Sequence, residues 1–228
     1  MAVAAALAPA AQAQTFPPPG SIAASANWAG YAASNAYYTH VTALLEAPTP
    51  DVLQVTGRAA SWVGIGGWAS NDLIQAGIVE AQAGDLYTYR AWYEMLPNPP
   101  VNIELPLQPG AWVLVDIREL RFNLWQISVV NGASVFQQQF MYASSHSSAE
   151  WILEAPAVVK NQSIADILPL SGVAGANFAK LGATANGVDA VPAQLFPSAT
   201  GIAFGPIKAA PTTIGPDGAT FSVVTAPA

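Results

Sequence analysis

The sequence predicts an all-β fold, an antiparallel two-sheet β-sandwich of the concanavalin or jelly-roll type. Three observations predict it. From residue 27 onward the chain consists of short runs rich in Val, Ile, Tyr and Trp, without a sustained 3.6-residue helical period. Turn sequences such as Asn-Gly at 131–132 and Pro-Asp-Gly at 216–218 separate the runs. A chain of 228 residues with 52% hydrophobic content can bury one core of this kind.

Nine runs have the length and the β-branched or aromatic content that strands require. They are residues 28–33, 38–47, 58–64, 73–81, 87–95, 112–120, 124–130, 134–141 and 150–154. No internal repeat and no linker divides the chain after residue 26. We therefore expect one β-sandwich domain over 27–228.

The N-terminal residues differ in composition from the rest. Residues 1–13 are small and apolar, and Ala-Gln-Ala at 11–13 fits a small-x-small cleavage site, so we expect the end of a secretory signal there. The alternative is a flexible alanine-rich tail. Residues 14–26 contain Pro-Pro-Pro-Gly and are expected to form a flexible lead-in. No apolar run reaches the roughly 18 residues of a membrane span, so we expect a soluble, secreted protein, extracellular or periplasmic.

Charge and residue usage exclude several classes of function. Charged residues make up 9% of the chain and the net charge is −7, without a basic cluster that could bind nucleic acid. The absence of cysteine excludes disulfides, thiolate catalysis and Cys-type zinc sites. With two histidines and no glycine-rich phosphate loop, any catalysis must use carboxylates and amides. We expect no cofactor, no metal and a monomer.

Period-two alternation decides which side chains share a face of each predicted strand. Glu94 shares a face with Arg90, and Gln75 shares a face with Gly77. Glu154 ends the last predicted strand on its more polar face. A glycine beside Gln75 is expected to leave room for the backbone of a substrate. Each strand thus has an apolar face for the core and a mixed face that can line a cleft.

Five motifs in order give the chain a resemblance to a known family. They are Asn-Trp-Ala-Gly at 27–30, Ser-Trp-Val-Gly-Ile at 61–65, Leu-Ile-Gln-Ala-Gly at 73–77, Ala-Trp-Tyr-Glu-Met at 91–95 and Ala-Glu-Trp-Ile-Leu-Glu at 149–154. With them the chain resembles the glutamic peptidases (eqolisins), acid-acting secreted endopeptidases with a β-sandwich fold. The resemblance extends from about residue 26 to the C-terminus and implies polypeptide substrates.

The resemblance also implies roles for individual residues. It makes Glu154 the general base and acid, and Gln75 the group that positions water and donates to the oxyanion. A carboxylate can take a proton from water and return it to the leaving amine. A carboxamide does not titrate, so Gln75 keeps its N–H donor in acid. Glu94, Trp62 and Trp68 are expected to bind substrate.

Every assignment has a simpler alternative. Gln75 would then be a solvated strand residue, and Glu154 would only end a strand. Glu94 would pair with Arg90 on its own strand face, and Trp62 would pack in the core. The whole site also has rivals: a glycosidase that uses Glu94 and Glu154 as paired carboxylates, or a non-catalytic carbohydrate- or protein-binding module.

Departures from the family pattern point to a bacterial-type relative. The acid that usually follows the Val-Gly-Ile motif is replaced by Gly66, so the contact made by that acid is expected to be missing. The disulfides of fungal members cannot form. In strong acid only seven Lys and Arg, two His and the amino terminus would carry charge. Repulsion would then be weak, and we expect the fold to survive in acid.

Overall fold

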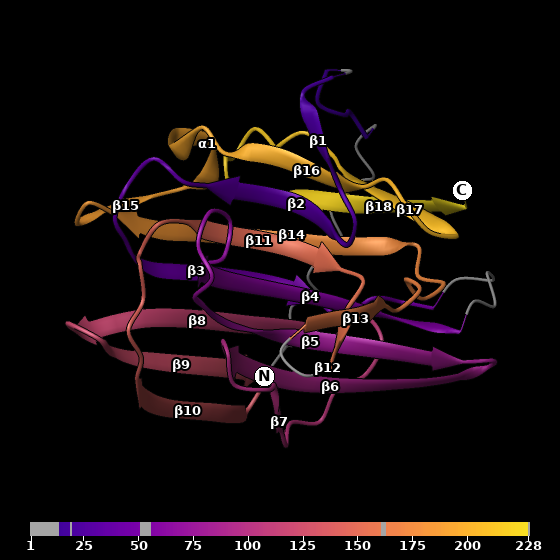
Figure 1. The fold of residues 1–228 in the computed structure, drawn as a ribbon, viewed down its shortest axis with the longest axis horizontal. Coiled ribbons are helices and arrows are strands. Elements are labelled where there is room, and N and C mark those ends of the chain that lie inside the picture. The colour runs from indigo at the N-terminus through magenta and orange to yellow at the C-terminus, as the bar shows by residue number, and fades with distance from the viewer. Residues whose placement is uncertain (1–13, 19, 51–55, 161–162, 228) are drawn as a thin grey trace, which may run out of the picture.

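The computed structural model describes residues 14–18, 20–50, 56–160 and 163–227. The expected signal segment, 1–13, lies outside the described residues. The described chain is almost entirely β-structure (Figure 1). Its elements are β1 (Ile22–Ser25), β2 (Trp28–Ala33), β3 (Tyr38–Glu46), β4 (Gly57–Gly66), β5 (Leu73–Ala83), β6 (Leu86–Met95), β7 (Val101–Ile103), β8 (Trp112–Arg121), β9 (Leu124–Asn131), β10 (Ser134–Met141), β11 (Ala149–Glu154), β12 (Ala157–Lys160), β13 (Ser163–Ile167), β14 (Gly175–Ala185), β15 (Val188–Ala190), α1 (Pro192–Leu195), β16 (Ser198–Ile202), β17 (Ile207–Pro211) and β18 (Phe221–Pro227).

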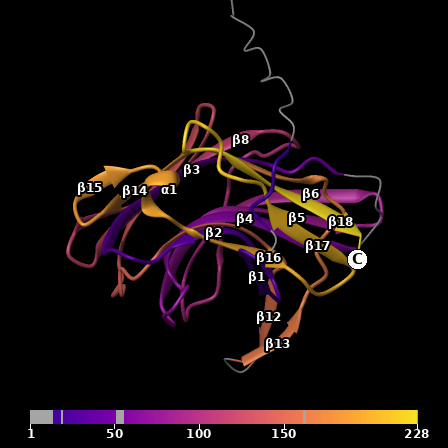
Figure 2. The ribbon, with the colours of Figure 1, turned by 90° about the horizontal axis from the view of Figure 1, so that it is seen from above.

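The strands form one hydrogen-bonded path that folds back on itself into two layers. Its order is β10-β9-β8-β3-β14-β18-β17-β16-β2-β11-β4-β5-β6-β7. We call β2, β11, β4, β5, β6 and β7 the site layer, and β10, β9, β8, β3 and β14 the second layer. All neighbours on the path are antiparallel, whereas β1 pairs with β16 in parallel. The strands of both layers run roughly horizontally in Figure 1, as in an aligned sandwich. β12 and β13 form a separate hairpin that projects from the layers (Figure 2).

The core lies between the two layers and follows the alternation of each strand. Val115 on β8 and Ile127 on β9 meet Ile65 on β4 and Ile78 on β5 in one apolar cluster. In β8 and β9 every second residue is buried, so the second layer is apolar on one face. β4 and β11 are buried on almost every residue, so the centre of the site layer is buried on both faces.

The predicted fold class is confirmed, and so are all nine predicted strands. They correspond to β2 to β6 and β8 to β11, and their ends differ from the expected ones by at most two residues. β7 and the strands after residue 154 were not predicted. The expected flexible lead-in, 14–26, includes β1, which joins the path beside β16. No helix among the described residues is long and apolar enough to cross a membrane.

Candidate active site

The face of the site layer that points away from the core carries the polar side chains that the sequence singled out; we call it the site face. Glu154 on β11 lies opposite Ala60 on β4. Gln75 on β5 lies opposite Gly64 on β4 and Glu94 on β6. Because side chains alternate along each strand, Gln75, Glu94 and Glu154 all project from the same face. The pattern predicted from the sequence therefore brings all three residues to one surface.

Gln75 is nearly buried and is held by Glu94. Its Nε2 donates to Oε2 of Glu94 at 2.6 Å. Its Oε1 is buried and has no hydrogen-bond partner among the residues that the structure describes. Burial raises the pKa of Glu94, and the hydrogen bond from Gln75 lowers it in part. No ion pair in the described part of the chain joins Glu94 to Arg90, which is exposed. The partner of Glu94 is therefore the amide.

Glu154 is half-buried, and both of its oxygens accept hydrogen bonds. Oε2 accepts the indole N–H of Trp62 at 2.8 Å, and Oε1 accepts the amide N–H of Asn27 at 3.0 Å. The ring of Trp28 packs edge-on against Trp62 at 5.0 Å between centroids. Burial raises the pKa of Glu154 to about 7; the bond from Trp62 lowers it, and the charge of Glu94 raises it. The site thus holds a carboxyl group that is more basic than an ordinary one.

Gln75 and Glu154 lie on opposite sides of β4, and no hydrogen bond joins their side chains in the described structure. Their neighbours on β4, Gly64 and Ala60, are four residues apart, which is about 13 Å along a flat strand. Trp62 lies between these two positions, where it is fully buried. It donates to Glu154 and also packs in an apolar cluster, as the alternative of core packing expected. A substrate-binding role for Trp62 gains no support from a side chain with no exposed surface.

Trp68, the other expected substrate contact, is half-buried in the loop between β4 and β5. Sequence reasoning missed three residues of this face. Asn27 binds Glu154, and the indole N–H of Trp92 is buried without a partner in the described structure. Glu150 is fully buried opposite Gly64, in the same cross-strand row as Gln75. The period-two alternation of residues 150–154 already places Glu150 on the same face as Glu154. That pattern could have identified Glu150 as a site residue.

Glu150 has an unusual environment for a carboxyl group. Neither of its oxygens has a partner with full hydrogen-bond geometry among the described residues. Burial raises its pKa well above the ordinary value, and the nearby Ser148 hydroxyl and Trp68 backbone N–H lower it only in part. Glu150 is therefore a neutral acid at acidic pH, and an isolated charge there would be costly.

Two glycines of the site differ from expectation. A Cβ at Gly77 would overlap the carbonyl oxygen of Ser61 and contact the backbone of Trp62. The space beside Gly77 is thus filled by β4, and the expectation that it admits a substrate backbone is wrong. Gly66 has φ +87°, and a Cβ there would lie 2.8 Å from Oδ2 of Asp72. A carboxylate from the loop before β5 therefore lies next to the position where the family's acid would begin.

Asp72 is held as an anion by the loops around it. Its Oδ2 accepts the backbone N–H of Ser145 at 2.6 Å and the hydroxyl of Ser144 at 3.3 Å. Burial works to raise the pKa of Asp72, but the hydrogen bonds from Ser145 and Ser70 lower it below the ordinary value. The end of the site face thus carries an acid that stays ionised in mildly acidic solution.

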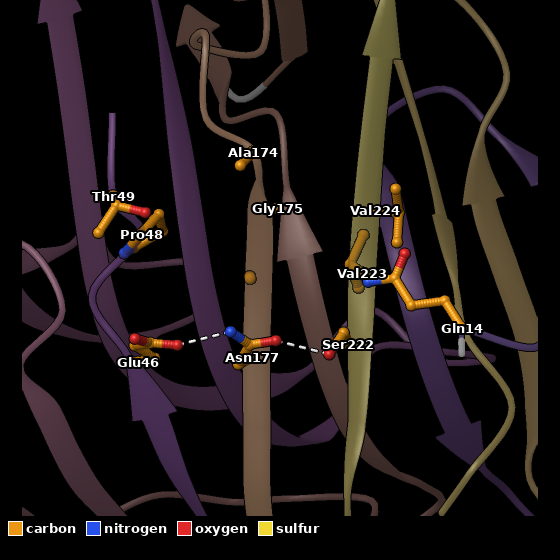
Figure 3. Close-up of a pocket in the computed structure, with 11 residues that line it drawn as sticks. Gln14, Glu46, Pro48, Thr49, Ala174, Gly175, Asn177, Ser222, Val223 and Val224 are labelled. Atoms are coloured by element: carbon orange, nitrogen blue, oxygen red, sulfur yellow. Dashed lines mark hydrogen bonds between the residues drawn. The ribbon is translucent and has the colours of Figure 1, made fainter. Parts of the chain in front are cut away.

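A hollow of about 170 Å³ lies away from these residues, between β3, β14 and β18 (Figure 3). Glu46 accepts a hydrogen bond from Asn177 at 2.6 Å, and Asn177 accepts one from Ser222 at 2.5 Å. Neither Gln75 nor Glu154 lines this hollow. Within the described residues no group of three His, Asp or Glu side chains is placed to hold a metal ion. The candidate catalytic residues thus lie on the site face and outside this hollow.

Comparisons with known proteins show the family and the fold of this chain. The model of the peptidase A4 family matches residues 26–195. Scytalido-glutamic peptidase, solved with a peptide-based transition-state analogue, is 19% identical, with a TM-score of 0.74 over 88% of this chain and 98% of that one. SCP-B, an eqolisin solved with the tripeptide Ala-Ile-His, is 18% identical, with a TM-score of 0.69 over 88% and 98%. Aspergilloglutamic peptidase from Aspergillus niger is 18% identical, with a TM-score of 0.61 over 75% and 99%. None of the curated proteins matches the chain.

The structural likeness confirms the sandwich, and the family match favours peptide hydrolysis over the glycosidase and the binding module. The match covers well over half of the chain and includes every motif that carried the resemblance. The chain therefore belongs to the peptidase A4 family, the glutamic peptidases or eqolisins, and is a peptide hydrolase.

Proposed function

We propose that the protein is a secreted endopeptidase in which Glu154 and Gln75 together activate water against a peptide bond. One observation carries the proposal. The site face presents a carboxyl group of raised pKa, held by two N–H donors, and a buried amide oxygen without a partner among the described residues. These are the groups that hydrolysis without a metal or a thiolate requires. The apolar segment 1–13 supports export.

Each step can be assigned to a group on the site face. The free Oε1 of Gln75 holds the attacking water, and ionised Glu154 takes a proton from it as the oxygen bonds to the carbonyl carbon. The carbonyl electrons move to its oxygen, which accepts the second N–H of Gln75; the first N–H is bonded to Glu94. Glu154 then gives its proton to the amide nitrogen, and the C–N bond breaks. Glu94 and Trp68 line the path of the substrate in this proposal.

The pKa of Glu154 limits the pH at which this mechanism works. As a base Glu154 must be ionised, so activity should fall as the pH drops below its pKa. With a pKa of about 7, only about one molecule in a hundred carries the ionised form at pH 5. A base with this pKa is half ionised at pH 7 and mostly neutral in acid, so activity in acid stays a prediction.

Two variants test the dyad. Glu154→Gln keeps the shape but removes the base, so cleavage of an unfolded protein substrate should fall by about 100- to 10,000-fold. Gln75→Ala should cost about 100- to 1,000-fold, as for loss of an oxyanion donor. Exposed residues provide matched controls, Glu104→Gln and Gln108→Ala, which should retain parental turnover. Full activity in a folded Glu154→Gln or Gln75→Ala variant would refute the dyad.

Secretion has its own test. Expression of the full chain in a secreting bacterial host, followed by N-terminal sequencing of the exported protein, should give a mature chain that begins at Gln14. A chain that stays inside the cells with residues 1–13 still attached would contradict the proposed signal. It would leave the dyad unaffected.

A further inference from the structure

One edge of the second layer lacks the features that usually protect an edge strand. In the described chain β10 is the last strand of the path and pairs on one side, with β9, in an unbroken register. It has eight residues and contains no proline and no charged residue. The opposite edge, β7, has three residues and lies between Pro100 and Pro106. Natural proteins shorten, charge or kink exposed edges to prevent pairing with other chains. β7 follows this rule and β10 does not.

The sequence of β10 is symmetric about its centre. Residues 135–141 read Val-Phe-Gln-Gln-Gln-Phe-Met, with Gln138 in the middle. Val135 and Met141 are 62% and 69% exposed. Phe136 and Phe140 face the other way, are half-buried and contact Tyr93. The two halves of the strand therefore carry equivalent side chains on each face.

This symmetry suits antiparallel pairing with an identical strand. With a two-fold axis through Gln138, Val135 lies opposite Met141 of the second copy, and Phe136 lies opposite Phe140. The glutamines lie opposite glutamines. Apolar residues thus meet apolar residues on both faces, and amides meet amides, so every cross-strand pair is compatible.

We propose that β10 is a docking edge for a second copy of this chain, and that the two copies extend the second layer across a two-fold axis. The pairing satisfies the outward N–H and C=O groups of both strands. It also buries Met141 and Val135, and Val135 continues an apolar row formed by Val130 and Leu114. Each copy carries a net charge of −7, but β10 and its turn are uncharged, so repulsion at the contact is small.

The expected dimer is weak and closed. The paired strands are about 27 Å long, so the contact is at the small end of protein interfaces, where complexes are transient. Each chain uses its β10 edge once, so association stops at two copies. This proposal differs from the monomer expected from the sequence, and the following measurement decides between them.

Sedimentation over roughly a hundredfold range of concentration at pH 7 should show the parental chain passing from monomer to dimer. Gln138 is exposed, so Gln138→Lys and Gln138→Glu should each fold but place like charges opposite each other at the axis. Each variant alone should remain monomeric. An equimolar mixture of the two should dimerise, because the opposite charges then face each other. Circular dichroism melting checks that both variants are folded.

Asn35→Lys, in the exposed turn between β2 and β3, makes the same charge change away from the edge and should dimerise like the parent. A parental chain that stays monomeric throughout would overturn the proposal. So would dimerisation of Gln138→Lys alone, or association that continues to larger assemblies as concentration rises.

Discussion

Buried carboxyl groups have raised pKa values in the site layer and a lowered pKa in the second layer. In the site layer Glu80, Glu150 and Glu154 have pKa values raised by burial, and no lysine or arginine pairs with them within the described chain. In the second layer Asp116 on β8 lies 2.6 Å from Nε2 of His40 and 3.5 Å from a guanidinium nitrogen of Arg118. Burial works to raise the pKa of Asp116, but these partners lower it below the ordinary value.

The difference follows from how each layer is covered. The site layer has apolar residues on both faces, whereas the second layer is open to solvent on one face, where cationic side chains can reach an acid. A buried acid without a cation is stabilised in its neutral form, and a paired acid in its charged form. The site layer is therefore suited to acidic solution and the second layer to neutral solution.

The largest effect is expected when a methyl group is added at the centre of the site layer, which is buried on both faces. Gly77→Ala places a methyl group against Ser61 and Trp62, where β4 leaves no space, and should lower the free energy of unfolding by about 3 kcal/mol. Gly182→Ala on β14 is the matched change in the second layer, where the new methyl would make ordinary contact with Thr42 at 3.4 Å. It should change stability by less than about 1 kcal/mol. Urea unfolding of both variants measures this, and equal losses would remove the contrast between the layers.

The second largest effect is expected from removing the indole N–H of Trp62, which lowers the pKa of Glu154. Trp62→Phe removes a hydrogen bond to the ionised form, so the pKa of Glu154 should rise by about one to two units. The acid limb of kcat/KM should then move to higher pH, with about 10- to 100-fold less activity below it. Trp151→Phe is the control, because the indole N–H of Trp151 binds the carbonyl of Thr42 in the main core. An unmoved limb in Trp62→Phe would show that Glu154 does not set it.

Glu80 tests whether neutral acids stabilise the site layer in acid. Its pKa is about 6 in the fold, raised by burial from an ordinary value of 4.5, although the Ser171 hydroxyl donates to it. Between these values the folded protein binds more protons than the unfolded one, so stability falls as the pH rises from 4.5 to 6. The loss at neutral pH is about 2 kcal/mol.

Glu80→Gln keeps an acceptor for Ser171 and cannot ionise. It should be more stable than the parent at pH 7 by about 2 kcal/mol and nearly equal to it at pH 4.5. Thermal melting at the two pH values makes the comparison, and the exposed Glu104→Gln should show no such difference. If Glu80→Gln is destabilised equally at both pH values, then loss of packing, not ionisation, is the cause.

The smallest effect is expected in the second layer. Asp116→Asn removes the charge that His40 and Arg118 stabilise. At pH 6 it should therefore lower the free energy of unfolding by about 1 kcal/mol. The pKa of Asp116 is lowered, so the parental advantage should disappear as the pH falls through it. Peptidase activity should not change, because Asp116 lies on the layer opposite the site. A loss of stability in Asp116→Asn that grows as the pH falls would mean that Asp116 is not stabilised in its charged form, and the contrast between the layers would fail.

The sequence was sufficient for the strands that have strong alternation and for the face that carries Gln75, Glu94 and Glu154. It was not sufficient for β14 to β18, because these segments are rich in Ala, Gly and Thr, and their strand character depends on long-range pairing.

Hydrogen-bond partners in the site also could not be derived from the sequence. Glu94 binds an amide on the neighbouring strand and not Arg90 on its own, because register decides which side chains meet. Asn27 reaches Glu154 across a separation of 127 residues, which no local pattern indicates. The neutral state of Glu150 depends on burial from both sides, which alternation along one strand does not reveal.

The path that joins the two layers also determines when the chain can fold during synthesis. β3 can pair with β8 early but gains its second neighbour only from β14, where Leu45 lies opposite Phe178. β2 likewise pairs with β11 and gains its second neighbour only from β16, where Gly30 lies opposite Thr200. The strands that connect the layers, β16 to β18, leave the ribosome after all the others. Such distant pairings make folding slow. The edges of β3 and β2 therefore stay open until nearly all of the chain has been made, and in that interval a holding chaperone would protect it from aggregation.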